Sequence, residues 1–270
     1  KIFFFYKKDL KKKENIYQVY KKKKFNLILH LAAQAGVRYS LKNPKNYLEN
    51  NIDVFLNILE FSKEKKINHL IYASSSSVYG ANLKQPFSEK NNVDHQISIY
   101  AVTKRTNELM AHTYSHLYDL PTTGIRFFTV YGPYGRPDMA LFKFTKNIIK
   151  NKKIELFNNG NHQRDFTYID DAVEGIFVLL LKPSRNKIPF KIFNIGNSKP
   201  KKLIDYLKHI ELKLNKKAKI KKLPLQVGDV IKTHSDTSSL KKFTGYSAKT
   251  NIDKGIGKFI EWYKNYHKVN

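Results

Sequence analysis

The sequence contains no cysteine, which excludes a disulfide framework, a thiolate metal site and a cysteine nucleophile. Long apolar runs are also missing. Residues 175–181 (GIFVLLL) are among the longest, and they fall far short of the about 20 residues that a membrane-spanning helix takes. The first residues do not have the layout of a signal peptide, because their apolar run covers only positions 2–6. We therefore expect a soluble, cytoplasmic protein with no membrane insertion and no metal site.

Arginine is scarce as well. Only six of the 50 basic residues are arginine, although the formal net charge is +28. Proteins that read DNA use arginine heavily for base edges and phosphates, whereas the lysines here are spread in short runs at 11–13, 21–24 and 216–222. This distribution favours solvated lysine positions, and we expect no nucleic-acid partner. Binding of another polyanion, or loose association with an acidic membrane surface, stays open as an alternative.

What the sequence does contain is the composition of a globular protein, with 41% hydrophobic and 13% aromatic residues in 270. In the first half, short apolar segments alternate with segments whose apolar residues recur at helical spacing. We expect buried strands at 25–33, 68–77 and 122–132, and helices at 47–66 and 99–118. This β-α-β-α-β order indicates an α/β fold with a doubly wound parallel sheet.

The second half is less regular. A lysine-rich helix is expected at about 201–215, and an amphipathic helix from Ile252 to Tyr263. No internal repeat and no long linker separate the halves. We therefore expect a smaller, mixed α/β lobe whose boundary with the sheet is interleaved.

Small and polar residues follow each expected strand, in HLAAQAG (30–36), SSSSVYG (74–80) and FFTVYGPYGR (127–136). In doubly wound sheets, ligands bind outside the carboxyl ends of the strands. Each segment taken alone is also what an ordinary turn needs. Three of them after successive strands indicate a binding site.

Tyr100 and Lys104 are four positions apart on the helix expected at 99–118, so they share one face. A tyrosine with its ordinary pKa of about 10 is a poor base at neutral pH, but a nearby ammonium favours the phenolate. Lowering the pKa by about 3 units takes about 4 kcal/mol, which a lysine together with a second nearby cation could supply. The alternative is an ordinary pair on a helix surface.

Ser75 lies twenty-five residues before the tyrosine. Ser75, Tyr100 and Lys104 together resemble the Ser/Tyr/Lys triad of the short-chain dehydrogenase/reductase superfamily. SSSSVYG and YAVTK resemble the motifs of its extended branch, the NAD-dependent nucleotide-sugar epimerases and dehydratases. The resemblance covers nearly the whole chain, including HQRDFTYIDDAVEGI (162–176), and is closest to the UDP-glucuronate 4-epimerases.

The resemblance implies a role for each member of the triad. Tyr100 would remove the proton from O4 of the sugar while hydride leaves C4 for NAD⁺. Lys104 would hold the nicotinamide ribose and lower the pKa of the tyrosine. Ser75 would donate a hydrogen bond to O4. The 4-keto sugar would then turn over and accept hydride on its other face, which inverts C4.

The resemblance also implies binding residues. Those expected at the NAD cofactor are Asp9, Leu10, Ala32, Ala33, Gln34, Asn51, Ser74, Tyr100, Lys104 and Phe127. Those expected at the UDP-sugar are Ser75, Ser76, Ser77, Thr129, Arg136 and Arg164. Arg164 suits the diphosphate, because a guanidinium matches phosphate oxygens with two hydrogen bonds; a plain surface arginine is the alternative.

Ser76 and Ser77 favour epimerisation over related reactions. Similar dehydratases place Asp-Glu at these positions, and similar decarboxylases place Ser-Glu. Two serines leave out the acid that those reactions need. Ser76, Ser77 and Thr129 would instead donate hydrogen bonds to the carboxylate of UDP-glucuronate and hold it against decarboxylation.

One departure from the family pattern concerns the start of the chain. The G-x-x-G-x-x-G turn that seats the NAD pyrophosphate is not present, and Lys8 stands where the family has glycine. We therefore expect an N-terminally truncated chain, with residues 1–135 as a partial NAD-binding core interleaved with parts of 160–200, and 136–270 mainly as a UDP-sugar lobe. The alternatives are a catalytically incomplete fragment and another UDP-hexose 4-epimerase. The family resemblance further implies a homodimer through the helix that carries Tyr100 and its neighbour (47–63).

Overall fold

The computed structural model describes residues 3–226 and 229–269. The chain forms two compact units. Unit 1 comprises Lys1–Asn82, Asn91–Arg126 and Val178–Phe193, and unit 2 comprises Leu83–Lys90, Phe127–Phe177 and Asn194–Asn270. Both units are therefore built from segments that are distant in the sequence.

A four-stranded sheet with the order β1-β2-β3-β8 has most of its residues in unit 1. Its strands are β1 (Leu27–His30), β2 (His69–Ala73), β3 (Thr122–Phe127) and β8 (Phe190–Ile195). β1 pairs in parallel with β2, with Leu27 opposite His69, and β2 pairs in parallel with β3, with Leu70 opposite Thr122. The expected α/β fold with a parallel central sheet is confirmed.

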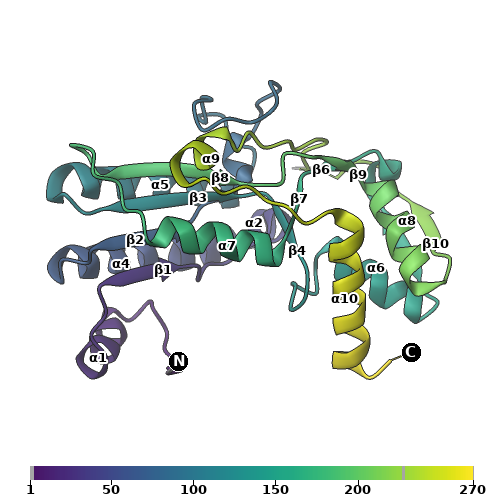
Figure 1. Ribbon diagram of the computed structural model, residues 1–270, viewed down its shortest axis with the longest axis horizontal. Coiled ribbons are helices and arrows are strands. Elements are labelled where there is room, and N and C mark those ends of the chain that lie inside the picture. The colour runs from purple at the N-terminus through teal and green to yellow at the C-terminus, as the bar shows by residue number, and fades with distance from the viewer. Residues whose placement is uncertain (1–2, 227–228, 270) are drawn as a thin grey trace. The chain divides into compact units, whose positions relative to one another are not determined.

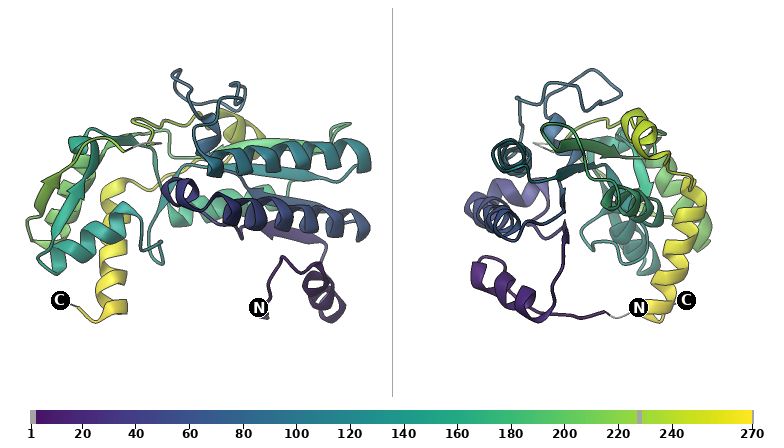
Figure 2. Two further views of the ribbon diagram at one scale, coloured as in Figure 1. Left: turned by 180° about the vertical axis from the view of Figure 1, so that it is seen from behind. Right: turned by 60° about the vertical axis from the view of Figure 1, so that its left-hand side comes forward.

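Helices and short helical turns precede β1 or connect β1, β2 and β3. They are α1 (Lys13–Lys22), α2 (Val37–Lys42), α3 (Pro44–Tyr47), the π-helix η1 (Leu48–Asp53), α4 (Val54–Glu64), the 3₁₀ turn η2 (Ser76–Tyr79) and α5 (Ile99–Tyr118). Helices α4 and α5 lie side by side (Figures 1 and 2). Their apolar faces join β2 in a core that includes Phe55, Leu59, Leu70 and Ala111.

Two expectations about strands were wrong in detail. β1 is not buried, because Leu27 and Leu29 are 36% and 39% exposed. The reason is its place at the end of the strand order, where it has one strand neighbour instead of two. The segment at 122–132 is not one strand either: it divides at Phe128 into β3 and β4 (Thr129–Tyr131), and β4 pairs with β7 (Phe166–Tyr168).

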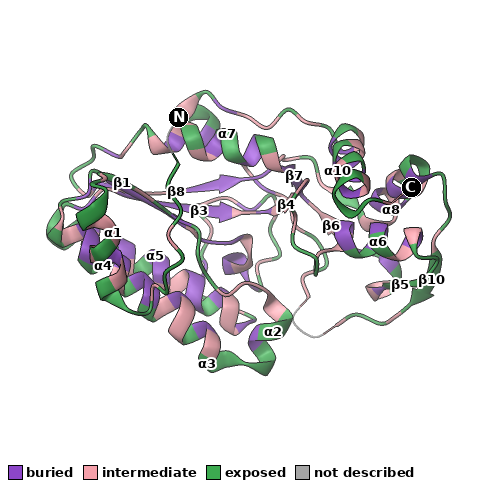
Figure 3. Cartoon of the chain, turned by 90° about the horizontal axis from the view of Figure 1, so that it is seen from below, coloured by how far each residue is buried: buried purple, intermediate pink, exposed green. Residues whose placement is uncertain are grey.

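Unit 2 has a core of its own. Besides β4 and β7, it contains α6 (Ala140–Ile149), β5 (Lys153–Leu156), η3 (Phe157–Gly160), β6 (Gln163–Arg164), most of α7 (Ile169–Leu180), β9 (Lys201–Lys202), α8 (Leu203–Leu214), β10 (Lys219–Lys222), α9 (Ser238–Thr244) and α10 (Ile252–His267). Helices α6, α8 and α10 each combine buried and exposed residues (Figure 3). Their buried sides pack around Phe166, Tyr206 and Phe259.

No helix within residues 3–226 and 229–269 is both long enough and apolar enough to cross a membrane.

Candidate active site

The first turns of α5 carry Tyr100 and Lys104. The helix begins where the side chain of Ser98 accepts a hydrogen bond from the backbone N–H of Ala101 at 3.2 Å, which is a standard N-cap. Lys104 is only 3% exposed, and its Nζ donates to the carbonyl oxygen of Ala73 at 2.7 Å. Because Ala73 ends β2, this bond anchors the lysine beside the serine cluster that follows the strand.

Burial changes the acidity of Lys104. It lowers the pKa of the ammonium from 10.5 to about 8, since the charged form loses its hydration. Burial also lowers the pKa of His30, at the end of β1, to about 4, and the positive charge of Lys104 adds to this effect. His30 is therefore neutral near pH 7, and a second positive charge beside Lys104 is avoided.

The serine cluster forms a tight turn next to α5. Ser75 caps η2 by accepting a hydrogen bond from the backbone N–H of Ser77 at 3.1 Å, and η2 packs against α5. Gly80 ends the turn with φ +53°, and a Cβ there would lie 2.0 Å from the carbonyl oxygen of His95. Only glycine fits this position. Ser75 is buried, whereas Ser76 and Ser77 are half-buried.

Asn51 links the segment after β1 to α5. Its Oδ1 accepts from the backbone N–H of Gln34 at 2.7 Å, and its Nδ2 donates to Gln34 O and to Thr103 Oγ1, both at 3.0 Å. Thr103 in turn donates to the carbonyl oxygen of Tyr100 at 2.9 Å. Asn51 lies in the π-helix η1, a type of segment that is frequent at functional sites. The structure thus connects Gln34, Asn51 and Tyr100 through one chain of hydrogen bonds.

Tyr47 is a residue that the sequence reasoning missed. It is fully buried, and its hydroxyl donates to the carbonyl oxygens of Ala35 and Gly36 at 2.9 and 2.6 Å. Its ring packs edge-on against the ring of Tyr100, with centroids 6.1 Å apart. In the sequence it is one aromatic residue in an ordinary helical pattern, which gives no sign of these contacts.

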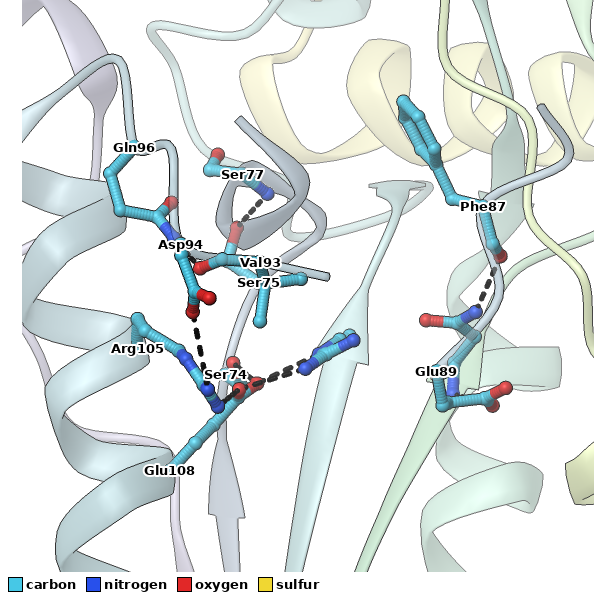
Figure 4. A network of polar contacts seen from close by, with 12 residues as sticks. Ser74, Ser75, Ser77, Phe87, Glu89, Val93, Asp94, Gln96, Arg105 and Glu108 are labelled. Atoms are coloured by element: carbon cyan, nitrogen blue, oxygen red, sulfur yellow. Dashed lines mark hydrogen bonds and ion pairs between the residues drawn. The ribbon is translucent and has the colours of Figure 1, made fainter. Parts of the chain in front are cut away.

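Glu108 and Arg126 were missed for a similar reason. Both are buried, and they form an ion pair. The hydroxyl of Ser74 donates a hydrogen bond to the Glu108 carboxylate of this pair (Figure 4). Their positions on one helix and one strand, eighteen residues apart, carry no local signal for the pairing.

The other residues predicted to bind the cofactor differ in their exposure and in their contacts. Ala32 and Ala33 follow β1 and are exposed. Asp9 accepts a hydrogen bond from the backbone N–H of Lys11 at 3.0 Å, in the turn before α1, and Leu10 packs against the core of unit 1. Phe127 is the last residue of β3 and is half-buried. Their roles at the cofactor stay predictions.

In unit 2, Thr129 and Arg136 line one small cavity. Its volume is about 40 Å³, and its lining also includes Met139, Phe166 and Tyr206. Arg136 donates to the carboxylate of Asp138 through Nε and Nη2, at 3.0 and 2.5 Å. This ion pair lowers the pKa of Asp138. The structure therefore brings together two of the residues predicted to bind the substrate.

Arg164 is held by the backbone around it. Its Nη1 donates to the carbonyl oxygen of Ile231 at 2.9 Å. The next residue, Asp165, is fully buried and accepts hydrogen bonds from the backbone N–H groups of Asn197, Ser198 and Ser235 and from the hydroxyl of Ser235. A buried carboxylate needs such partners, and these bonds fix the segment that carries Arg164.

Comparison with protein families gives an independent view of the chain. Residues 1–196 match the model of the NAD dependent epimerase/dehydratase family. Protein CapI of Staphylococcus aureus is 50% identical over 280 residues, an alignment that covers 98% of this chain and 84% of CapI. A probable UDP-glucuronate 4-epimerase of Rhizobium meliloti (strain 1021) is 44% identical over 260 residues, covering 90% of this chain and 76% of that protein.

A solved structure has the same fold. The UDP-glucuronic acid 4-epimerase from Bacillus cereus, in complex with UDP-glucuronic acid and NAD, superposes with a TM-score of 0.86 and 31% sequence identity. The match covers 96% of this chain and 79% of the Bacillus cereus chain.

Proposed function

The chain belongs to the NAD dependent epimerase/dehydratase family, and on that premise we propose that it is a UDP-sugar 4-epimerase that converts UDP-glucuronate to UDP-galacturonate. By family it is an enzyme that depends on NAD. The observation that carries the proposal is the buried ammonium of Lys104, bonded to the strand end that leads into Ser75 and one helical turn from Tyr100.

The residues of unit 1 fit the NAD cofactor. An ammonium has three N–H donors. Ala73 accepts one of those of Lys104, so the buried group has further donors for ribose hydroxyls. Gln34 and Asn51 would border the cofactor on the side of β1, where their mutual hydrogen bonds fix the backbone. When bound, the cofactor would supply the acceptor for hydride from C4 of the sugar and the donor for its return. We propose that unit 1 is the NAD-binding part and unit 2 mainly the UDP-sugar part.

Three side chains of unit 1 would take part in proton transfer at O4. Tyr100, as phenolate, takes the proton from the O4 hydroxyl and returns it after the sugar has turned. The charge of Lys104 favours the phenolate because opposite charges attract more strongly in a buried site. Ser75 donates a hydrogen bond to O4 as negative charge develops there.

Recognition of the sugar nucleotide would involve both charged and neutral groups. We propose that Arg164 binds the diphosphate, and that Arg136 acts at the sugar end. Ser76, Ser77 and Thr129 would donate hydrogen bonds to the carboxylate of the uronate. The choice of UDP-glucuronate is supported by the Rhizobium meliloti relative and by the Bacillus cereus structure, which carry this substrate in their names.

Product analysis tests the proposed reaction. Protein expressed from its complete coding sequence is incubated with UDP-glucuronate or UDP-glucose, and the C4 epimers are separated. We expect a higher kcat/KM for the uronate, because a hydroxymethyl group would leave hydroxyl donors of the closed site unpaired at a cost of about 1–3 kcal/mol each. Equal kcat/KM values would refute the uronate assignment and leave an epimerase of broader range.

A pair of matched variants tests the base. Tyr100→Phe removes only the hydroxyl and should lower kcat by about 10²–10⁴-fold, while UDP-sugar binding is retained. Tyr118→Phe makes the same change at the last residue of α5, which is 48% exposed, and should leave kcat unchanged. Near-normal turnover by Tyr100→Phe would remove Tyr100 from the mechanism.

We further propose a homodimer through α4 and α5. Leu56 on α4 and Val102 and Leu109 on α5 are 42%, 38% and 53% exposed, so both of these neighbouring helices offer apolar side chains to a partner subunit. Leu109→Glu should shift the protein from dimer to monomer in sedimentation analysis, and a dimer that persists would place the interface elsewhere. A cytoplasmic location stays a prediction.

A further inference from the structure

Glu108 lies at the centre of the buried polar network in unit 1. It is on α5, one turn after Lys104, and its side chain is completely buried. Its carboxylate accepts hydrogen bonds from Arg126 Nε at 2.8 Å, Arg126 Nη2 at 2.9 Å and Ser74 Oγ at 2.6 Å. Arg105 adds a longer contact at 3.3 Å. Figure 4 shows Ser74, Arg105 and Glu108 pointing toward one another.

A need for stability alone does not explain this ion pair. Removing two charges from water is costly, and apolar residues of similar volume often replace a buried ion pair with little loss of stability. Buried polar groups have a better-attested use in fixing one arrangement among several. We therefore expect Glu108 and Arg126 to fix one arrangement of the elements that they join.

The contacts join three elements that meet at the catalytic residues. Ser74 follows the end of β2, Arg126 is near the end of β3, and Glu108 is on α5. Lys104 is bonded to Ala73 and Glu108 to Ser74, so two successive turns of α5 hold two successive residues of one strand end. Two such attachments set both the distance and the rotation of the segment relative to the helix. The next residue in that segment is Ser75.

Arg126 also contacts the end of the serine turn. Its guanidinium lies over the ring of Tyr79, 4.9 Å from the centroid, and Tyr79 is the last residue of η2. Arginine stacks readily on aromatic faces. The turn Ser76–Tyr79 is thus held at its start through Ser74 and at its end through Tyr79, and both contacts depend on the Glu108–Arg126 pair.

We propose that Glu108 and Arg126 are positioning residues, which set the spacing between Ser75 and Tyr100 by fixing the strand end against α5. This rests on the proposed function, in which Ser75 and Tyr100 act on the same oxygen. A misplacement of about 1 Å can lower a rate by about 10²-fold. The pair therefore acts on kcat, whereas the binding of the UDP-sugar depends on other groups.

The double variant Glu108→Leu/Arg126→Met tests the proposal without leaving a buried charge unpaired. We expect kcat for UDP-glucuronate to fall by about 10–100-fold, with KM changed by less than about twofold and a melting temperature close to that of the wild type. A folded double variant with wild-type kcat would overturn the proposal. A fall in kcat accompanied by an equal rise in KM would also overturn it.

A milder pair of variants covers the case in which the double variant does not fold. Ser74→Ala keeps the ion pair and removes only its bond to the strand end, and it should lower kcat by about 10-fold with rescue by Ser74→Thr. Ser115→Ala is the matched control: Ser115 is also buried on α5, and its hydroxyl donates to the carbonyl oxygen of Leu120 at 2.7 Å, far along the helix from Tyr100. Equal kcat values for the Ser74→Ala and Ser115→Ala variants would refute the role of Ser74.

Hydrogen exchange separates this proposal from the proposed function. In Ser74→Ala and in the double variant, the backbone amides of residues 75–79 should exchange faster than in the wild type, and those in Ser115→Ala should not. If the wild type epimerises no UDP-sugar, the proposed function fails while this measurement still reports on the network. Unchanged exchange at 75–79 in all variants would show that Glu108 and Arg126 do not position the turn.

Discussion

The buried Lys104 should leave a distinct mark on the pH dependence of stability. Its pKa is lowered by burial from 10.5 to about 8. In the unfolded chain the lysine regains its ordinary pKa, so the unfolded state binds more protons than the folded state between about pH 8 and 10.5. The free energy of unfolding should therefore rise with pH across this range. Below pH 8 both states are protonated, and the full penalty of the buried charge is present.

The size of the effect follows from the two pKa values. Their difference corresponds to a penalty of about 3 kcal/mol at neutral pH. Between pH 7 and 9.5 about 2 kcal/mol of this penalty is relieved. Lys104→Met removes the charge and retains a flexible apolar chain of similar length. It also removes the hydrogen bond to Ala73, but that loss does not depend on pH.

Urea unfolding at pH 7, 8, 9 and 9.5 measures the effect, without added NAD or UDP-sugar. Other groups titrate in the wild type and in Lys104→Met alike, so the difference between the two proteins isolates Lys104. We expect the wild type to gain about 2 kcal/mol relative to the variant from pH 7 to 9.5. A difference that stays constant over this range would refute the lowered pKa and with it the idea of a desolvated ammonium beside Ser75.

Three further predictions concern other buried groups. The pKa of His30 is lowered to about 4, so the protein should lose about 2 kcal/mol of stability between pH 7 and 5, because the unfolded histidine takes up a proton that the folded one does not. His30→Gln should abolish this pH dependence in urea unfolding. A pH dependence that persists in the variant would assign it to another group. Tyr47→Phe should lower the free energy of unfolding by about 1–2 kcal/mol, since two carbonyl oxygens lose their donor. It should also weaken NAD binding in titration calorimetry. An unchanged Kd would show that Tyr47 has no part in cofactor binding. Asp165→Asn should destabilise unit 2 by about 1–3 kcal/mol, because an amide offers one acceptor oxygen to donor groups that now use two. It should also raise KM, since the segment that carries Arg164 would be held less firmly. A normal KM in the folded variant would show that Arg164 does not depend on the hydrogen bonds of Asp165.

The local features of the site could be predicted from the sequence. The spacing of apolar residues predicted a helix at 99–118, and α5 has these bounds. That helix places Tyr100 and Lys104 one turn apart in any folded protein, because the α-helix has a fixed period. The serine-rich segment predicted a turn after a strand, and Ser75 and Gly80 form it. These features depend on neighbours within a few residues, which the sequence contains.

The burial and pairing of side chains could not be predicted from the sequence, because they depend on contacts between distant segments. In the sequence, Lys104 looks no different from the many exposed lysines of the chain. Its burial comes from its contact with Ala73 of β2, thirty-one residues earlier. Glu108 pairs with Arg126 and Ser74 because a helix and two strand ends converge, and Asn51 uses its amide on Gln34 and Thr103 for the same reason. The division of 122–132 at Phe128 likewise follows from hydrogen bonds to residues 165 and 195. Local propensity is a property of a short segment, whereas desolvation and ion pairing depend on which distant segments the fold brings into contact.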